Sequence, residues 1–371
     1  MEYDEYAAKL CQNNGQCYYI LEMVGEGATS YVYKGIDPAK KEYAIKIYTN
    51  KEAYLKETSI LSKLKSNKNI VKLFQHGIGF LERGCSIKTY QITNYFCNEE
   101  INFAAFEYLS NGVLFDYVML LNRKFSEKIA KKIFLEVLEA VEFLHKNGIS
   151  HGDIKLENIM LTKNFNSKLI DFGFSSLSEN GKIYSISGTK HYASPEVYTS
   201  ATKGYSGEKN DIFSLGVLLF VLITGVFPFE KPSAVDPTYK LIIKNDYEGF
   251  WSKNKFNFCS NEFRDLFFKM IKYLPKDRIS LKEIKEHPFL KVSDKKCNDN
   301  EEEKFYNSYG FKQKMNINDN DSVKAKEKFN KSNNNFCKIK ITSLIKENSD
   351  EIYFKELIKR KNLIKQIQAG N

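Results

Sequence analysis

The hydrophobic pattern of this chain changes at about residue 110. Across 18–109, short runs rich in β-branched and aromatic residues alternate apolar with polar side chains, and only 51–65 shows helical spacing. Across 111–290 the apolar residues recur every three to four positions. The pattern predicts an α+β chain in which a small β-rich unit precedes a larger helical unit. The clearest helical patterns cover 129–145, 211–223 and 261–274.

The composition changes again after residue 290. Residues 291–371 are rich in Asn, Lys, Asp and Glu, and they hold 18 Lys/Arg against 12 Asp/Glu, so most of the formal net charge of +10 belongs to them. Such a composition lacks the apolar residues that a core needs. We expect a polar, basic and partly disordered tail, with a possible amphipathic helix at 352–368.

The cysteines and the apolar runs narrow the cellular setting. The seven Cys residues are scattered and form no C-x-x-C pair, which favours reduced thiols over a disulfide framework. No apolar run is long enough to span a membrane, and Glu2 occupies the position where N-myristoylation requires Gly. We expect an intracellular, cytoplasmic protein, with a nuclear location left open, and neither a membrane span nor a nucleic-acid partner.

A glycine-containing turn and an isolated lysine mark the β-rich unit. Gly25, Glu26 and Gly27 lie between two strand-like runs, where backbone N–H groups can approach phosphates. Lys46 lies in an otherwise apolar strand, where a charge needs an anionic partner. Glu57 lies on the apolar face of the following helix, so it is the expected partner of Lys46.

The strongest chemical signal is a loop from His151 to Asn158 with the sequence His-Gly-Asp-Ile-Lys-Leu-Glu-Asn. An apolar strand and then Asp171-Phe172-Gly173 follow it. Phosphoryl transfer needs a carboxylate that accepts the proton of the attacking hydroxyl, cations on the transferred phosphate, and oxygen ligands for Mg²⁺. These motifs provide all three in the order that kinases show. The chain therefore resembles the eukaryotic protein kinases.

The resemblance covers about 18–290 and implies a bilobal protein-kinase fold. It implies a β-rich lobe at 18–109 with a five-stranded sheet, and a helical lobe at 110–290. A short N-terminal extension at 1–17 and the tail at 291–371 fall outside the resemblance. It also implies that ATP and Mg²⁺ are used and that the partners are protein substrates with Ser or Thr acceptors.

The resemblance assigns a role to each residue of the loop. Asp153 is expected to act as the base, Lys155 to steady the γ-phosphate, and Asn158 and Asp171 to hold Mg²⁺. The expected catalytic set is Asp153, Lys155, Asn158, Lys46 and Glu57, and the expected ATP-binding set is Gly25, Glu26, Gly27, Val32, Ala44, Lys46, Glu107, Leu109 and Met160.

Other matches concern residues that support the reacting groups. A hydrophobic stack is expected to link the lobes in the active state. A carboxylate–arginine pair is expected to hold the end of the activation segment, and an aspartate to anchor the catalytic loop. The residues of the stack are Leu61, Leu73, His151 and Phe172. The carboxylate–arginine pair is Glu196 and Arg278. The anchoring aspartate is Asp211.

Two residues favour Ser/Thr over Tyr acceptors. Lys155 lies two residues after the base, and Thr189 lies where Ser/Thr kinases place a hydroxyl that bonds both the base and that lysine. The remaining motifs look most like those of the calmodulin-dependent and energy-sensing kinase group.

Gly152 departs from the family pattern, in which Arg precedes the catalytic Asp and receives a phosphate of the activation segment. Ala53 and Ser176 occupy the other two basic positions of that pocket. We therefore hypothesise that Ser185, which aligns with the usual phosphorylation site, does not activate this chain through an arginine clamp.

The positions expected to select the substrate peptide also depart from the family pattern. Val113 and Val221 stand where kinases that prefer basic peptides carry carboxylates. We expect a weak requirement for Arg before the acceptor residue.

Two other functions stay open. Small-molecule kinases of the aminoglycoside and choline type also carry His-Gly-Asp followed five residues later by Asn, but they lack the equivalents of Lys155, Thr189 and Arg278. A pseudokinase scaffold usually lacks one of the catalytic residues, whereas Lys46 and Asp153 are present.

The basic stretch at 352–368 is a candidate for calmodulin binding or autoinhibition.

Overall fold

The computed structural model describes residues 8–83, 100–120, 125–177, 182–184, 188–199, 203–254, 256 and 258–291. They belong to one unit, Met1–Cys297, and the second unit, Asn298–Asn371, falls outside the described residues. Ser185 and the expected helix at 352–368 fall outside them too, so both stay predictions.

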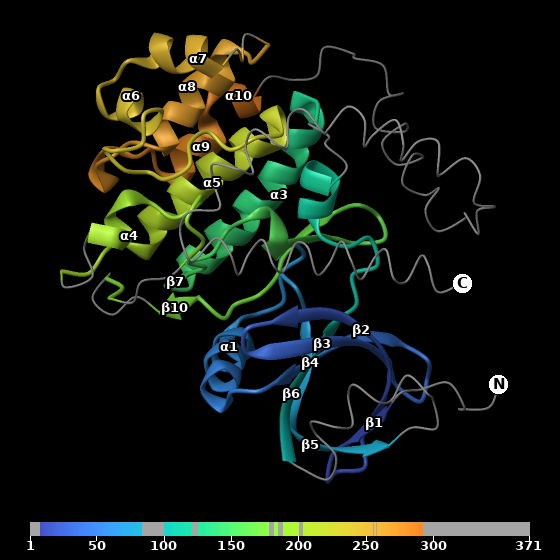
Figure 1. Ribbon diagram of the computed structural model, residues 1–371. Helices are drawn as coiled ribbons and strands as arrows, with labels where there is room; N and C mark the ends of the chain where they lie inside the picture. The colour runs from blue at the N-terminus through green and yellow to red at the C-terminus, as the bar shows by residue number, and fades with distance from the viewer. Residues whose placement is uncertain are drawn as a thin grey trace, which may run out of the picture. The chain divides into compact units, whose positions relative to one another are not determined.

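Six antiparallel strands close into a barrel in the order β1-β2-β3-β4-β6-β5, with β1 paired to β5 (Figure 1). Side chains alternate between the two faces of each strand: Ile45 and Ile47 are fully buried, whereas Ala44 and Lys46 lie on the opposite face. This alternation turns Lys46 away from the interior of the barrel. The strands are β1 Ala8–Cys11, β2 Cys17–Gly27, β3 Ser30–Ile36, β4 Glu42–Tyr48, β5 Leu73–Arg83 and β6 Glu100–Glu107.

Strand β1 makes the small lobe larger than the five-stranded sheet expected from the sequence. It lies before residue 18 and pairs with both β2 and β5. Ala8 and Leu10 are fully buried inside the barrel, whereas Lys9 and Cys11 point outward. A run of four residues is too short for its alternation to predict a strand. Pairing on both sides leaves no open edge at β2 or β5.

Helix α1, Lys51–Lys63, lies beside the barrel and contacts β4, β5 and β6 (Figure 1). The Asn50 side chain caps its first turn by accepting a hydrogen bond from the Ala53 N–H at 3.0 Å. Its buried face includes Glu57 and Leu61. A carboxylate therefore lies on the face that contacts the barrel.

The helical region is built on α3, Glu127–Lys146, and α5, Gly207–Thr224, which contact each other (Figure 1). Ser126 and Ser206 cap their N-termini. Helix α5 ends at Gly225, whose φ of 76° is the left-handed conformation that Gly adopts without strain. Almost every residue of α5 is buried, as expected for a helix that is apolar on all sides.

Helix α8, Asn261–Met270, is shorter than the pattern predicted, because the sequence indicated helix through residue 274. The helix ends at its C-cap Ile271, and Pro275 disfavours helical backbone only at Leu274, the residue before it. The other elements of the region are η2 Asp116–Leu120, β7 Ile149–Ser150, η3 Leu156–Asn158, β8 Ile159–Leu161, β9 Ser167–Leu169, β10 Ser176–Leu177, α4 Pro195–Thr199, α6 Tyr239–Ile243, α7 Tyr247–Asn254, η4 Pro275–Asp277, α9 Leu281–Glu286 and α10 Pro288–Lys291.

Two short sheets carry the loop between α3 and α5. Strand β7 pairs with β10, and β8 pairs with β9. The loop from His151 to Asn158 begins directly after β7 and ends where β8 begins. Its two ends are thereby fixed by backbone pairing. In the described part of the chain, no helix combines the length and the apolar content that a membrane crossing requires.

Candidate active site

Lys46 is the centre of a charged cluster between the barrel and the helical region. Its Nζ lies 2.6 Å from Oε2 of Glu57 and 3.2 Å from Oδ1 of Asp171. Burial lowers the pKa of Lys46, but the two carboxylates raise it more, so the pKa lies above the ordinary lysine value of 10.5. The lysine is therefore charged at neutral pH.

Tyr48 is a member of this cluster that the sequence motifs did not reveal. Its hydroxyl donates to Oε2 of Glu57 at 3.0 Å, and the tyrosine is 3% exposed. Burial and then the Glu57 carboxylate raise its pKa, so the hydroxyl keeps its proton and stays a donor. Its position in the strand could have revealed it. Residues two apart in a strand lie on the same face, and Tyr48 lies two residues after Lys46. The other oxygen of Glu57 accepts the backbone N–H of Phe172 at 3.3 Å.

Asp153 is held by two side chains from different parts of the chain. The Thr189 hydroxyl donates to Oδ1 of Asp153 at 2.8 Å, and Nζ of Lys155 lies 2.7 Å from Oδ2. Lys155 also donates to the Thr189 hydroxyl at 2.9 Å. Burial lowers the pKa of Lys155, but the Asp153 carboxylate raises it more, so this lysine is a permanent cation. The three side chains form a closed triangle.

Asn158 and Asp171 lie next to each other at the candidate metal position. The Ile170 N–H donates to the carbonyl oxygen of Asn158 at 2.9 Å. The Asn158 amide nitrogen donates to the carbonyl oxygen of Asp153 at 2.8 Å and to its Oδ2 at 3.0 Å, so its amide oxygen is not used in these bonds. Carboxylate and amide oxygens are the hard ligands that Mg²⁺ prefers, so the donor set fits this cation.

Asp171 has a backbone conformation that is unusual for a residue other than Gly. Its φ of 59° lies in the left-handed region, which costs of order 1 kcal/mol and persists only where neighbours hold it. Its Oδ1 accepts the Gly173 N–H at 3.3 Å as well as the Lys46 ammonium. Burial raises the pKa of Asp171, but Lys46 lowers it more, so the pKa lies below the ordinary value of 3.8.

Asp211, at the start of α5, holds the catalytic loop by its backbone. Its Oδ2 accepts the N–H of His151 at 2.9 Å, and its Oδ1 accepts the N–H of Gly152 at 2.9 Å. Nε2 of His145 lies 2.8 Å from Oδ2. Because Asp211 is fully buried, these bonds satisfy a charge that would otherwise be costly.

Two of the four residues of the expected hydrophobic stack, His151 and Phe172, are in direct contact. The rings of His151 and Phe172 lie edge to face with centroids 5.1 Å apart, and both residues are fully buried. Leu61 is buried on α1 and Leu73 is half-buried at the start of β5.

The residues expected to contact ATP come from β2, β3, β4, β8, the end of β6 and the chain just after it. Val32 is the cross-strand partner of Lys46, and Ala44 is the partner of Phe106. Met160 forms an isolated bridge with Val113. Gly25 pairs with Val32, Gly27 pairs with Ser30, Glu26 is exposed between them, and Leu109 is buried just after β6.

Glu107 has a structural contact that the sequence did not predict. Its side-chain oxygen accepts the Lys72 N–H at 2.7 Å and lies 2.6 Å from Nζ of Lys168. The carboxylate therefore ties the end of β6 to β9, which carries Lys168.

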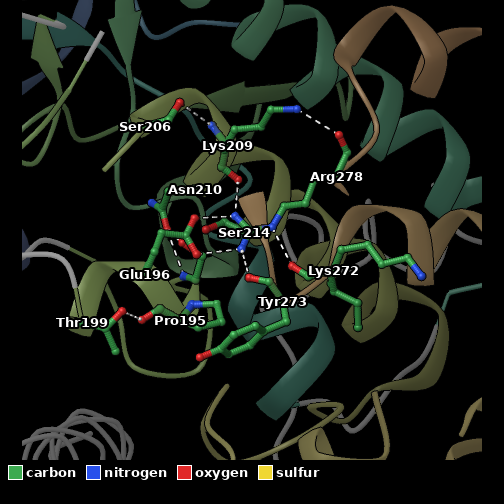
Figure 2. A network of polar contacts seen from close by, with 12 residues as sticks. Pro195, Glu196, Thr199, Ser206, Lys209, Asn210, Ser214, Lys272, Tyr273 and Arg278 are labelled. Atoms are coloured by element: carbon green, nitrogen blue, oxygen red, sulfur yellow. Dashed lines mark hydrogen bonds and ion pairs between the residues drawn. The ribbon is translucent and has the colours of Figure 1, made fainter. Parts of the chain in front are cut away.

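Arg278 and Glu196 form a buried, bidentate ion pair (Figure 2). The two nitrogen–oxygen distances are 2.5 and 2.7 Å. The remaining guanidinium donors reach the carbonyl oxygens of Lys209, Lys272 and Tyr273 at 3.0, 2.8 and 3.2 Å, and Figure 2 shows these carbonyls around the arginine. The pair joins α4 to the loop after α8.

Comparison with known proteins agrees with this geometry. The protein kinase domain family matches residues 18–290. CBL-interacting protein kinase 10 of Oryza sativa subsp. japonica is 30% identical over 280 residues, covering 74% of this chain and 57% of that protein. CBL-interacting serine/threonine-protein kinase 5 of Arabidopsis thaliana is 32% identical over 281 residues, covering 74% of this chain and 58% of that protein.

The chain belongs to the protein kinase family. This confirms the family that the motifs predicted. It also confirms the α+β fold, with its β-rich N-terminal region and helical C-terminal region. The matches also agree with the resemblance to the calmodulin-dependent and energy-sensing group. The chain spans a little more than half the length of these relatives.

Proposed function

We propose that this chain transfers the γ-phosphate of ATP to Ser and Thr hydroxyls of proteins. The observation that carries the proposal is the closed triangle of Asp153, Lys155 and Thr189, in which each side chain contacts the other two. A carboxylate fixed in this way can orient a hydroxyl and accept its proton. The charged Lys155 beside it can stabilise the negative charge of the phosphate in transfer.

ATP is the proposed phosphate donor, with Lys46 as its main cationic ligand. Glu57 and Tyr48 fix the position of the ammonium, and the half-buried Val32, Ala44 and Met160 offer apolar surface for the base. Asn158 and Asp171 would hold Mg²⁺, which neutralises phosphate charge when it is bound.

A protein acceptor is favoured over a small molecule because the chain extends the site well beyond the reacting groups. Thr189 belongs to the segment that continues into α4, and Glu196 in α4 is locked to Arg278. This platform supports an extended peptide next to Asp153. Small-molecule kinases and pseudokinases stay as alternatives that the experiment below separates.

The test is phosphate transfer from Mg·ATP to an arrayed peptide library and to small-molecule acceptors. The unchanged protein is expected to phosphorylate Ser and Thr peptides, and Asp153→Asn is expected to reduce the rate by about 100-fold or more, as for loss of a general base. Asp171→Asn is the control for the metal site. Transfer only to small molecules would support the first alternative, and ATP binding without any transfer the second.

We also propose that activity does not depend on an arginine–phosphate clamp. Ala53, Gly152 and Ser176 replace the basic residues that such a clamp uses. Ser185→Ala is therefore expected to keep most of the activity. A protein that loses activity on this change and regains it when Ser185 is phosphorylated would overturn the idea.

Partners beyond substrates are proposed from two directions. The relatives are named as CBL-interacting, and an interaction with a CBL protein is the corresponding proposal for this chain. The basic stretch at 352–368, outside the described residues, is the candidate for autoinhibition or calmodulin binding. Both roles can be tested by measuring the kinase rates of three samples: the full chain alone, the full chain with Ca²⁺/calmodulin, and a protein truncated after Leu290. Equal rates in all three would remove them.

A further inference from the structure

The segment that leads to Thr189 needs an anchor other than a phosphate. Kinase activation segments are commonly ordered by new arginine–phosphate pairs, and the three positions that would form them here are Ala53, Gly152 and Ser176. None of these side chains carries the positive charge that would form an ion pair with a phosphate. The described residues of the segment, 182–184, show what holds it instead.

Ile183 is bonded to the chain that enters α5. Its N–H donates to the carbonyl oxygen of Tyr205 at 2.8 Å, and the Tyr205 N–H donates back to Ile183 at 2.9 Å. The neighbouring Lys182 donates through Nζ to the carbonyl oxygen of Lys203 at 3.2 Å. The segment is thereby paired along its backbone.

Two glycines allow this close approach. A Cβ on Gly207 would overlap with Cδ1 of Ile183 and with Oγ of Ser150, which directly precedes the catalytic loop. A Cβ on Gly204, whose φ is 68°, would lie 2.9 Å from the ring of Tyr184. The Ile183 side chain thus fills the space above the first residue of α5.

The Ile183 side chain is also part of a small apolar cluster. Ile183 is 5% exposed and packs with Ala193, Val197 and Tyr205, all buried. We call these four residues the apolar clasp. Ala193 continues the connection, because its N–H donates to the carbonyl oxygen of Thr189 at 2.9 Å. Thr189 in turn donates to the Asp153 carboxylate.

We propose that the apolar clasp anchors the activation segment in place of a phosphate, with Ile183 as a positioning residue for Thr189 and the acceptor peptide. This rests on the proposed kinase function. The clasp forms from unmodified side chains, so the segment is held in its working position without phosphorylation. Ile183 does not touch the reacting atoms and acts through Ala193 and Thr189.

The experiment uses the full chain, treated with phosphatase, in four forms: unchanged, Ile183→Ala, Ile183→Leu and Ile284→Ala. Ile284 is fully buried in α9 and serves as the control for loss of core volume. Ile183→Ala is expected to lower kcat/KM for peptide by about tenfold or more, since small displacements of positioning groups cost up to about 100-fold, with KM for ATP changed by less than about twofold. Ile183→Leu is expected to restore most of the peptide kinetics.

Amide hydrogen exchange across 182–205 gives a readout that does not depend on activity. Faster exchange there in Ile183→Ala, and not in Ile284→Ala, supports the anchor even if no form transfers phosphate, in which case only the kinase proposal fails. Equal exchange in the unchanged protein and Ile183→Ala would overturn the clasp. So would an unchanged protein that transfers phosphate only before phosphatase treatment, or Ile183→Ala and Ile284→Ala losing peptide kinetics equally.

Discussion

The Tyr48 hydroxyl donates a hydrogen bond of 3.0 Å to the Glu57 oxygen that also binds the Lys46 ammonium. Tyr48 lies in β4 and Glu57 in α1, so this bond fixes the helix to the barrel at the point where the lysine must be held. An aromatic contact also joins the strand to the helix, because the ring centroids of Tyr48 and of Tyr54 in α1 lie 5.5 Å apart. The position of the lysine therefore depends on more than its ion pair.

Tyr48→Phe is expected to lower kcat/KM about tenfold in a phosphate-transfer assay. This corresponds to about 1.4 kcal/mol, the lower end for a hydrogen bond to a charged group. Tyr43→Phe is the matched control, because its hydroxyl donates to Asp37 from the same strand at 3.0 Å, outside the site. Equal losses in the two variants would show that the Tyr48 bond has no special role.

Arg278→Met is expected to destabilise the protein by about 3–5 kcal/mol, because it leaves the buried Glu196 carboxylate without a cationic partner. The quantity to measure is the free energy of unfolding in urea. Lys68→Ala removes a pair with Glu139 whose side chains are 78% and 42% exposed, and it is expected to leave the free energy of unfolding almost unchanged, because exposed ion pairs contribute little. Similar values for the two variants would contradict the assignment.

Leu10→Ala is expected to cost about 2–5 kcal/mol of unfolding free energy, because it opens a cavity inside the closed barrel. Lys9→Ala, on the outer face of the same strand, changes only an exposed pair with Glu82 and is expected to cost less than about 1 kcal/mol. If both changes are tolerated alike, β1 is not part of the stable barrel.

Asp171 predicts a pH dependence of stability. Its pKa in the folded chain lies below the ordinary value of 3.8, so the folded state favours the ionised carboxylate. Its contribution is present above the ordinary pKa and is lost as the pH falls through the folded value. Compared with Asp171→Asn, the unchanged protein should resist more urea at neutral pH, and the difference should shrink as the pH falls below the ordinary value of 3.8. A difference that grows toward acid would contradict this sign.

Peptide preference tests the two valines at the expected substrate-binding positions. Val221 is fully buried in α5 and Val113 is half-buried. Both side chains are apolar, so neither position offers a carboxylate to an incoming arginine. An arrayed library should show weak selection for Arg before the acceptor. Strong selection of Arg three residues before it would refute the expectation.

Part of the site could be read from spacing alone. The strand period puts Lys46 on the face opposite Ile45, and the helix period puts Glu57 on the face of α1 that contacts the barrel. The structure brings their charged atoms to 2.6 Å. The same reasoning missed Tyr48 and Ile183, because tyrosines and isoleucines in such runs usually belong to the core, and their partners come from distant parts of the chain.

The sequence by itself determined the family, the change from strands to helices near residue 110, and the identity of the charged residues around Asp153. Local period and motif order are properties of neighbouring residues, so they are visible without a fold. The tertiary structure decided what surrounds them. β1 closes the barrel because β2 and β5 both offer it an edge, and Ile183 packs on Ala193, which bonds to Thr189, because Gly207 leaves room for the isoleucine. Such contacts join residues far apart in the chain, and only the folded backbone brings them within reach.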